Sequence, residues 1–380
     1  MHLSEYTKAT GINVIFIFSI SMLSPVLAPY IKSLGFDNIQ LSLIFAVMPF
    51  MIIFSSPIIG RISDNIGRKN VILAGVLAEI VAICLYMFGT GSAAIIIARA
   101  IDAVAATAVS MAALAKIEDC VNDKTRGRYA GASLSIEYIG RLAGPVIGGL
   151  LADMIFVQAP FLAAILILTG LILFIPKKKI VRKDIQKKEL DLAGAIRTFL
   201  SYRELRGMAI LGIVMHATFP AIMIFLPLLI TESMGLSYVY VGYAYFAIGA
   251  THILQFVFGR WSDRKAYRTV LAGTFISGVF LALLSQAAAY PLLLAILFLK
   301  GIGNSMWNVS AWTLMSNIGE RTKTEGEIIG TYISIAKIGS LISFIASGFI
   351  VEIYGISTLF MLNGILILIG TVIAYPLMKK

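Results

Sequence analysis

Long apolar runs alternate with short charged gaps along almost the whole chain. A helix of about 20 residues crosses the hydrocarbon core of a bilayer. Lipid offers no hydrogen-bond partners, so the backbone of a spanning segment must bond to itself, as a helix does. The sequence therefore predicts an all-α multi-span membrane protein. Twelve spans are predicted, at residues 11–31, 41–60, 70–89, 93–115, 129–151, 159–176, 207–231, 238–259, 269–289, 291–315, 328–350 and 355–377.

One long basic gap, residues 177–206, divides six predicted spans from six. We expect an N-terminal six-helix bundle at 1–176 and a C-terminal six-helix bundle at 207–380, with residues 177–206 as a cytoplasmic linker. The lysines of this gap suit a solvated connector that lies against anionic lipid headgroups. A regulatory surface is the alternative interpretation.

The placement of the charges sets the orientation of the chain. The chain is 59% hydrophobic and 13% charged, whereas a soluble domain is about a quarter charged. The 31 Lys and Arg exceed the 20 Asp and Glu, but 26 of these bases lie at the termini or in gaps after even-numbered spans. This is the bias of cytoplasmic loops and not of a nucleic-acid-binding surface. We therefore expect both termini to lie in the cytoplasm and the chain to lie in the cell membrane.

The gap at residues 60–69 is repeated, in degraded form, 199 residues later. Several glycines around the fifth span recur at the same offset, so the two halves are copies of one unit, arranged as a parallel repeat. The recurring positions are Gly60, Arg61, Ser63 and Asp64 with Gly259, Arg260, Ser262 and Asp263, and Gly127, Gly131, Gly140 and Gly149 with Gly326, Gly330, Gly339 and Gly348.

This gap resembles the loop between helices 2 and 3 of major facilitator superfamily transporters, G-x-x-x-D-x-x-G-R-[RK]. The resemblance implies two pseudo-symmetric six-helix bundles with a substrate site between the halves. It also implies that Asp64 and Arg68 form a latch on the cytoplasmic side that breaks during alternating access. A tight turn with basic anchors is the alternative. The matched positions are Gly60, Asp64, Gly67, Arg68 and Lys69, and the second copy keeps Asp263.

The fifth span carries a glycine-rich pattern. Its glycines at intervals of four form a small-residue ridge that permits close helix approach, and a proline within the helix allows a bend. Plain helix packing would explain this pattern. The pattern also resembles the fifth-span motif of drug:proton antiporters, which implies exchange of cargo for protons. Its residues are Gly131, Gly140, Gly144, Pro145, Gly148 and Gly149.

Charged residues inside the N-terminal spans are the candidates for proton coupling. Glu137 and Arg141, one turn apart, share a helix face, and charges within a membrane are costly and commonly functional. A structural ion pair is the alternative. Arg99 and Asp102 form a similar pair, and Arg99 resembles a basic residue in the fourth span of proton-coupled family members. Asp102 is the second candidate proton carrier, and Glu79 is a weaker one.

The C-terminal half offers a different set of polar residues. Lys300, Asn304, Trp307 and Asn308 fall on one stripe of the tenth span, and Lys337 lies in the eleventh. We expect these residues to form a cavity wall that contacts substrate. Pairing of Lys300 with a buried acid is the alternative. If all the buried groups ionise, four bases exceed three acids, which favours anionic or neutral cargo over lipophilic cations.

The resemblance implies a secondary active transporter, and we expect proton-coupled efflux of a small amphiphilic molecule. A nutrient importer, either symporter or facilitator, is the alternative, and a non-transporting receptor or scaffold is a third. No nucleophile–base arrangement, phosphate loop, metal-ligand spacing or dinucleotide fingerprint occurs in the sequence. We therefore expect no enzyme activity, metal or cofactor. The expected partners are the substrate, protons and the bilayer, and the expected state is a monomer.

The charge distribution makes a testable statement about topology. A cysteine placed at Lys183 should escape membrane-impermeant thiol reagents on intact cells, whereas one at Asp37 or Glu232 should be labelled. The unmodified chain, with its own Cys84 and Cys120, serves as the background control. Labelling at position 183 from outside would reverse the predicted orientation.

Overall fold

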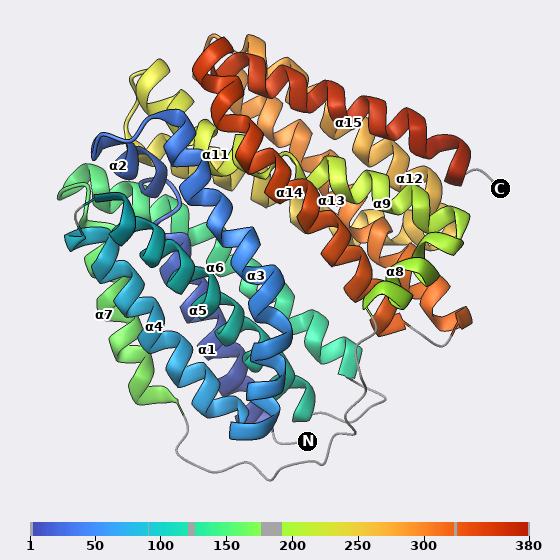
Figure 1. The fold of residues 1–380 in the computed structure, drawn as a ribbon, viewed down its shortest axis with the longest axis horizontal. Helices are drawn as coiled ribbons and strands as arrows, with labels where there is room; N and C mark the ends of the chain where they lie inside the picture. The colour runs from blue at the N-terminus through green and yellow to red at the C-terminus, as the bar shows by residue number, and fades with distance from the viewer. Residues whose placement is uncertain (1–2, 90, 121–125, 176–191, 323–324, 379–380) are drawn as a thin grey trace. The chain divides into compact units, whose positions relative to one another are not determined.

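The computed structural model describes residues 3–89, 91–120, 126–175, 192–322 and 325–378 (Figure 1). All secondary structure within these ranges is helical. The N-terminal half contains α1 (Leu3–Ser21), α2 (Leu27–Ser33), α3 (Asn38–Ile66), α4 (Arg68–Phe88), α5 (Gly91–Asp119), α6 (Arg126–Met154) and α7 (Ala159–Phe174).

The C-terminal half repeats this order with more irregular turns. It contains α8 (Leu192–Ser201), α9 (Arg203–His216), η1 (Ala221–Phe225), α10 (Leu226–Leu228), η2 (Leu229–Ser233), α11 (Tyr238–Ala250), η3 (Thr251–Leu254), α12 (Gln255–Leu283), η4 (Leu284–Gln286), α13 (Tyr290–Thr322), α14 (Glu325–Tyr354) and α15 (Ile356–Met378).

The predicted all-α multi-span fold is confirmed, since the predicted spans fall on these helices. Eight helical segments among the described residues are long and apolar enough to cross a membrane. One of them, Tyr238–Gln286, is 49 residues long and carries two predicted spans. These two spans are separated at Lys265, whose backbone (φ −147°, ψ 53°) is not helical.

The first predicted span, 11–31, is divided between α1 and α2. The intervening residues 22–26 form turns in which Leu23 and Ser24 bond three residues back instead of four. Pro25 accounts for this break, because proline lacks an N–H and disfavours helical backbone in the residue before it. The seventh predicted span is irregular for a related reason. Pro227 lies between the π-helical turns η1 and η2. Because proline has no N–H, one backbone hydrogen bond to the preceding turn is missing there.

The chain forms two compact units. Unit 1 consists of residues 1–34, 44–187 and 235–242, and unit 2 of residues 35–43, 188–234 and 243–380. In unit 1, α1 packs against α5, α6 and α7, and α4 packs against α5 and α7 (Figure 1). In unit 2, α12 packs against α13 and α15, while α9 packs against α14 and α15.

The predicted linker between the halves, residues 177–206, is described only in part. Residues 177–191 lie outside the described residues, and the remainder of the linker carries α8 and the first turn of α9. The division at 1–176, 177–206 and 207–380 therefore stays a prediction.

A carboxylate anchors residues 235–242 within unit 1. Asp153, at the end of α6, accepts hydrogen bonds from the backbone N–H groups of Tyr238 (2.9 Å) and Val239 (2.8 Å). These N–H groups open α11 and have no partner within their own helix. Unit 2 contains the corresponding contact, because Glu352, which is 199 residues after Asp153, accepts a 2.7 Å bond from Asn38 at the start of α3.

We expect Asp153→Ala to destabilise the protein by about 0.5–2 kcal/mol, the usual effect of removing a helix cap. Thermal unfolding of the purified protein in detergent measures this loss. Asp263→Ala is the control, because Asp263 is exposed and, within the described ranges, has no hydrogen bond or ion pair. Equal melting temperatures for the two variants would mean that the cap contributes nothing.

Candidate functional site

Glu137 is held by two partners on different sides of its carboxylate. Its Oε1 accepts from Arg141 Nε at 2.8 Å, and its Oε2 accepts from Asn13 Nδ2 of α1 at 2.7 Å. Glu137 is 7% exposed, whereas the Arg141 side chain is 50% exposed. The acid is thus buried against α1, and its cation reaches toward solvent-accessible space.

The glycine ridge of α6 brings α1 close enough for the contact with Asn13. A Cβ at Gly144 would lie 2.8 Å from the carbonyl oxygen of Phe18, and one at Gly148 would overlap the carbonyl oxygen of Met22. Gly140 lies against α1 in the same way. Side chains at these positions would push the helices apart. Pro145 and Gly149 belong to the same helix, as does Gly131 nearer its start.

Arg99 and Asp102 form a second buried pair on α5. Arg99 Nη1 lies 2.7 Å from Asp102 Oδ2, and the same oxygen accepts a 2.9 Å bond from the hydroxyl of Tyr86 on α4. Arg99 also contacts Met48 Sδ at 3.3 Å, and its guanidinium lies 4.4 Å from the centre of the Phe45 ring. Arg99 thereby connects α5 to α3, while the bond between Tyr86 and Asp102 connects α4 to α5.

Glu79 lies beside this pair without a hydrogen bond to it. The residue is 1% exposed, and its Oε2 has no hydrogen-bond partner among the described residues. The charges of both Asp102 and Arg99 act on it. Burial of a carboxylate oxygen without a hydrogen bond is costly, which distinguishes Glu79 from the hydrogen-bonded acids Asp102 and Glu137.

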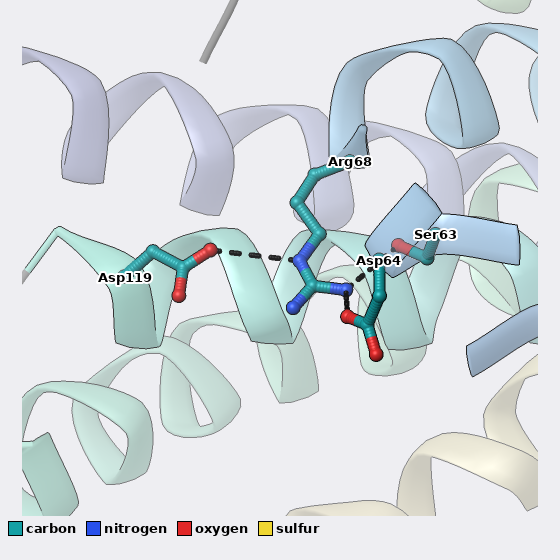
Figure 2. A network of polar contacts seen from close by, with 4 residues as sticks. All are labelled: Ser63, Asp64, Arg68 and Asp119. Atoms are coloured by element: carbon teal, nitrogen blue, oxygen red, sulfur yellow. Dashed lines mark hydrogen bonds and ion pairs between the residues drawn. The ribbon is translucent and has the colours of Figure 1, made fainter. Parts of the chain in front are cut away.

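The residues of the 60–69 motif form a polar cluster around Arg68, drawn in Figure 2. Arg68 Nη1 pairs with Asp64 and donates to Ser63 Oγ at 3.1 Å, while Arg68 Nε lies 3.5 Å from Asp119 Oδ2 at the end of α5. Gly67 takes a positive φ of 90° between α3 and α4, a conformation that glycine adopts without steric cost. Gly60 lies within α3, and Lys69 follows Arg68 in α4.

The last turn of α5 is also tied to α1. Lys116 is 2% exposed, and its Nζ lies 3.2 Å from Glu5 Oε2. Burial alone would raise the pKa of Glu5, but the neighbouring ammonium groups of Lys116 and Lys8 outweigh it and hold that pKa below its ordinary value. The end of α5 therefore contacts α1 through Lys116 and α4 through Asp119.

The second copy of the motif is not arranged in the same way. Position 267, which corresponds to Arg68, is a tyrosine, and its hydroxyl accepts from Arg268 at 2.8 Å. Asp263 is an exposed residue of α12. An ion pair like that of Asp64 and Arg68 is therefore a feature of the first copy alone, as far as the described residues extend.

The polar residues along α13 differ in how deeply they are buried. Lys300 is 1% exposed and donates to Asn304 Oδ1 at 3.3 Å; that oxygen also accepts from Ser277 at 2.9 Å. Asn308, further along α13, accepts a 2.9 Å bond from the indole of Trp312. No carboxylate in the described part of the chain pairs with Lys300, so a structural ion pair is not what holds it.

Lys337, on α14, lies near a group of aromatic side chains. Its Nζ is 5.4 Å from the centre of the Phe219 ring, and its charge acts on His216. The His216 ring lies 5.7 Å from that of Trp307 on α13. Lys337 therefore lies beside the same group of rings as Trp307, which belongs to the polar stripe of α13.

Sequence reasoning identified the charged residues but not their partners on other helices. Asn13, Tyr86 and Asp119 each bond to a predicted site residue. A polar residue inside an apolar span was the available signal for Asn13 and Tyr86, but helical periodicity does not say which neighbouring helix it meets. The described residues contain no group of three His, Cys, Asp or Glu side chains able to hold a metal ion.

Comparison with known proteins gives a consistent result. The profile of the Major Facilitator Superfamily matches residues 9–318 and, in a second match, residues 244–380. An uncharacterised MFS-type transporter of Methanocaldococcus jannaschii is 26% identical over 366 residues, covering 94% of this chain and 93% of that protein. The quinolone resistance protein NorA of Staphylococcus aureus is 26% identical over 342 residues, covering 87% of each. The crystal structure of the nucleoside transporter NupG is similar with a TM-score of 0.79 at 13% identity, covering 100% of both chains, which shows the fold.

The contacts of unit 1 predict a rank order of stability losses. Asp102→Asn should cost the most, about 3–5 kcal/mol, because it removes the carboxylate that pairs directly with the buried guanidinium of Arg99. Tyr86→Phe removes one neutral donor and should cost about 1–3 kcal/mol. Asp64→Asn, in a pair that is partly exposed, should cost at most about 1 kcal/mol.

Thermal unfolding of the three variants in one detergent measures this order. Asp64→Asn is the control, because it removes the charge of a side chain that is 35% exposed instead of buried. A larger loss for Asp64→Asn than for Asp102→Asn would contradict the assignment of the buried pair.

Proposed function

The chain belongs to the major facilitator superfamily, and from this premise we propose that it is a proton-coupled antiporter that exports a small amphiphilic molecule. The observation that carries the proposal is the Glu137 carboxylate, buried between Arg141 and Asn13 on the glycine ridge of α6. A membrane-embedded acid with a separable cation is what proton coupling requires, since movement that parts the pair changes the affinity of the acid for a proton.

The partial exposure of Arg141 supports this role for the pair. Water weakens the attraction between two charges, so an ion pair with one partner exposed is easier to separate than a fully buried one. Here the carboxylate is buried and the guanidinium is half exposed. A modest movement of Arg141 into water would leave Glu137 with only the neutral amide of Asn13, a change of surroundings that proton coupling through this acid would use.

The relatives favour export over import. A protein similar along 87% of the chain is named for quinolone resistance, a property that removal of the drug from the cell would produce. The glycine pattern of α6 resembles that of drug:proton antiporters and supports the same direction. Import of a nutrient is the second candidate, because the fold is also that of a nucleoside transporter.

The remaining expectations form part of the proposal. We place the chain in the cell membrane with both termini in the cytoplasm. We treat it as a monomer of two six-helix bundles. The cluster around Arg68 then lies on the cytoplasmic side. Asp64 and Arg68 act there as a latch, which is strong enough to favour one state and, being partly exposed, weak enough to open. Asp102, Glu79 and the polar residues of α13 and α14 complete the coupling and cargo machinery.

Glu137→Gln tests the proposal, because glutamine has the shape of the protonated acid but cannot exchange a proton. We expect gradient-driven export of a fluorescent quinolone from cells to be lost, while binding of the quinolone to purified protein is retained. Proton uptake or release on quinolone addition, followed with a pH dye in detergent, should disappear in this variant.

Asp102→Asn is the comparison variant, since it removes the second candidate carrier. If Asp102→Asn abolishes the proton signal and Glu137→Gln preserves it, the carrier lies on α5. Direction is tested in the parent protein with a protonophore, which should raise cellular quinolone for an exporter. A fall in cellular quinolone would identify an importer.

A further inference from the structure

The segment of α12 between two predicted spans carries a strongly basic surface. Its one acid, Asp263, is exposed, and so are all four of its bases. Residues 260–268 therefore have three more positive than negative charges, from four bases and one acid. We call these bases, together with the exposed rings of Phe256 and Trp261, the α12 patch. The bases are Arg260, Arg264, Lys265 and Arg268.

None of these bases is paired with an acid in the part of the chain that the structure describes. The guanidinium of Arg260 lies 4.7 Å from the centre of the Phe256 ring, and Arg268 donates to the neutral hydroxyl of Tyr267 at 2.8 Å. Arg264 and Lys265 make no hydrogen bond or ion pair there. The excess charge of the patch is therefore not compensated by neighbouring side chains.

The corresponding position in unit 1 is compensated by the chain itself. Arg68 pairs with Asp64 and lies 3.5 Å from Asp119 at the end of α5. The residue 199 positions after Asp119 is Ile318, so the second copy of the motif lacks this acid. The counterpart of Asp64, Asp263, has no ion pair among the described residues.

The second copy has also gained bases. Arg264 and Lys265 occupy the positions at which the first copy has the neutral residues Asn65 and Ile66. Two positive charges have thus been added to a loop from which an acid partner is missing. The negative charge that unit 1 provides from its own side chains is left, in unit 2, to the surroundings of the chain.

The α12 patch lies where the chain passes from lipid to water. The predicted spans 238–259 and 269–289 flank it, and the helix is interrupted within it at Lys265 (φ −147°, ψ 53°). Phe256 is 72% exposed and Trp261 is 56% exposed. Tryptophan is enriched at membrane interfaces, where its ring contacts lipid while its N–H stays among the headgroups. Exposed rings beside exposed bases match the two parts of a phospholipid, whereas a soluble phosphate would leave the rings without a partner.

We propose that the α12 patch binds the headgroup of an anionic phospholipid. Arg264 and Lys265 donate to its phosphate oxygens, a charge-assisted contact that both side chains form well, and Trp261 lies against its glycerol and upper acyl region. The lipid supplies to unit 2 the negative charge that Asp64 and Asp119 supply to unit 1. This binding requires neither proton coupling nor a particular direction of transport.

Fluorescence of Trp261 in reconstituted membranes tests the site. The full-length protein is placed in vesicles of equal parts phosphatidylglycerol and phosphatidylcholine. Brominated acyl chains, which quench tryptophan on contact, are carried by one lipid in one preparation and by the other in a second. The surface charge is then the same in both. The chain has three Trp residues, so the signal of Trp261 is the difference between the parent protein and Trp261→Phe.

We expect phosphatidylglycerol to be preferred over phosphatidylcholine beside Trp261 by at least about tenfold. Each base near an anionic membrane surface strengthens the attraction about fivefold. The double variant Arg264→Gln/Lys265→Gln should therefore lower the preference about tenfold or more. The matched control, Arg61→Gln/Lys69→Gln, removes the same number of charges from the first copy of the motif and should leave the preference at Trp261 unchanged.

Equal quenching by the two brominated lipids in the parent protein overturns the proposal. An equal loss of preference in both double variants also overturns it, because net charge alone would then be responsible. Glycerol phosphate, the headgroup chemistry without acyl chains, should not relieve the quenching when added in excess. Relief by glycerol phosphate or by inorganic phosphate would mean that the patch takes a soluble phosphate and not a lipid.

A measurement on the parent protein decides the question even if the double variant does not fold. Raising the salt concentration from about 0.1 M to about 1 M shortens the screening length from about 10 Å to about 3 Å. The preference for phosphatidylglycerol should then fall severalfold. A preference that salt does not change contradicts binding through the exposed bases.

Discussion

Polar groups within a hydrocarbon layer must find their hydrogen-bond partners in the protein, because lipid offers none. Helices meet this requirement for the backbone, but each polar side chain inside them must be satisfied by a neighbouring helix. Glu137 is satisfied by Arg141 and by Asn13 of α1, and Asp102 by Arg99 and by Tyr86 of α4. The buried groups that lack partners therefore stand out against a structure in which partners are the rule.

The two halves use the same helical framework for different buried charges. The offset of 199 residues relates the glycines of α6 to those of α14, and both helices use glycine for close contacts, as Gly144 does with α1 and Gly339 with Ile213 of α9. The predicted spans of the N-terminal half, however, contain acids, whereas those of the C-terminal half contain Lys300 and Lys337 and no acid.

The sequence allowed the helices and the pairs within a helix to be predicted, because both depend on spacing along one segment. Glu137 with Arg141 and Arg99 with Asp102 are of this kind. Asn13 lies 124 residues from Glu137, and Met48 lies 51 residues from Arg99. Periodicity gives the face on which such a residue lies but not the height at which two helices cross. The clustering of His216, Trp307 and Lys337 depends on three such crossings and could not be predicted for the same reason.

The charge of the cargo determines how strongly the membrane potential drives export. Moving one elementary charge across 100 mV changes the free energy by about 2.3 kcal/mol. Exchange of an outgoing monocation for an incoming proton transfers no net charge, so only the pH difference drives it. Exchange of an outgoing monoanion for a proton moves two positive charges inward, which adds about 4.6 kcal/mol per 100 mV of inside-negative potential. A carrier that exchanges one monoanion for one proton at a single carboxylate would therefore export its cargo against a far steeper gradient. The same pairing used for import would gain nothing from the potential, since an anion and a proton entering together carry no net charge. For an anionic cargo, the membrane potential therefore assists exchange with an incoming proton and does not assist entry together with one.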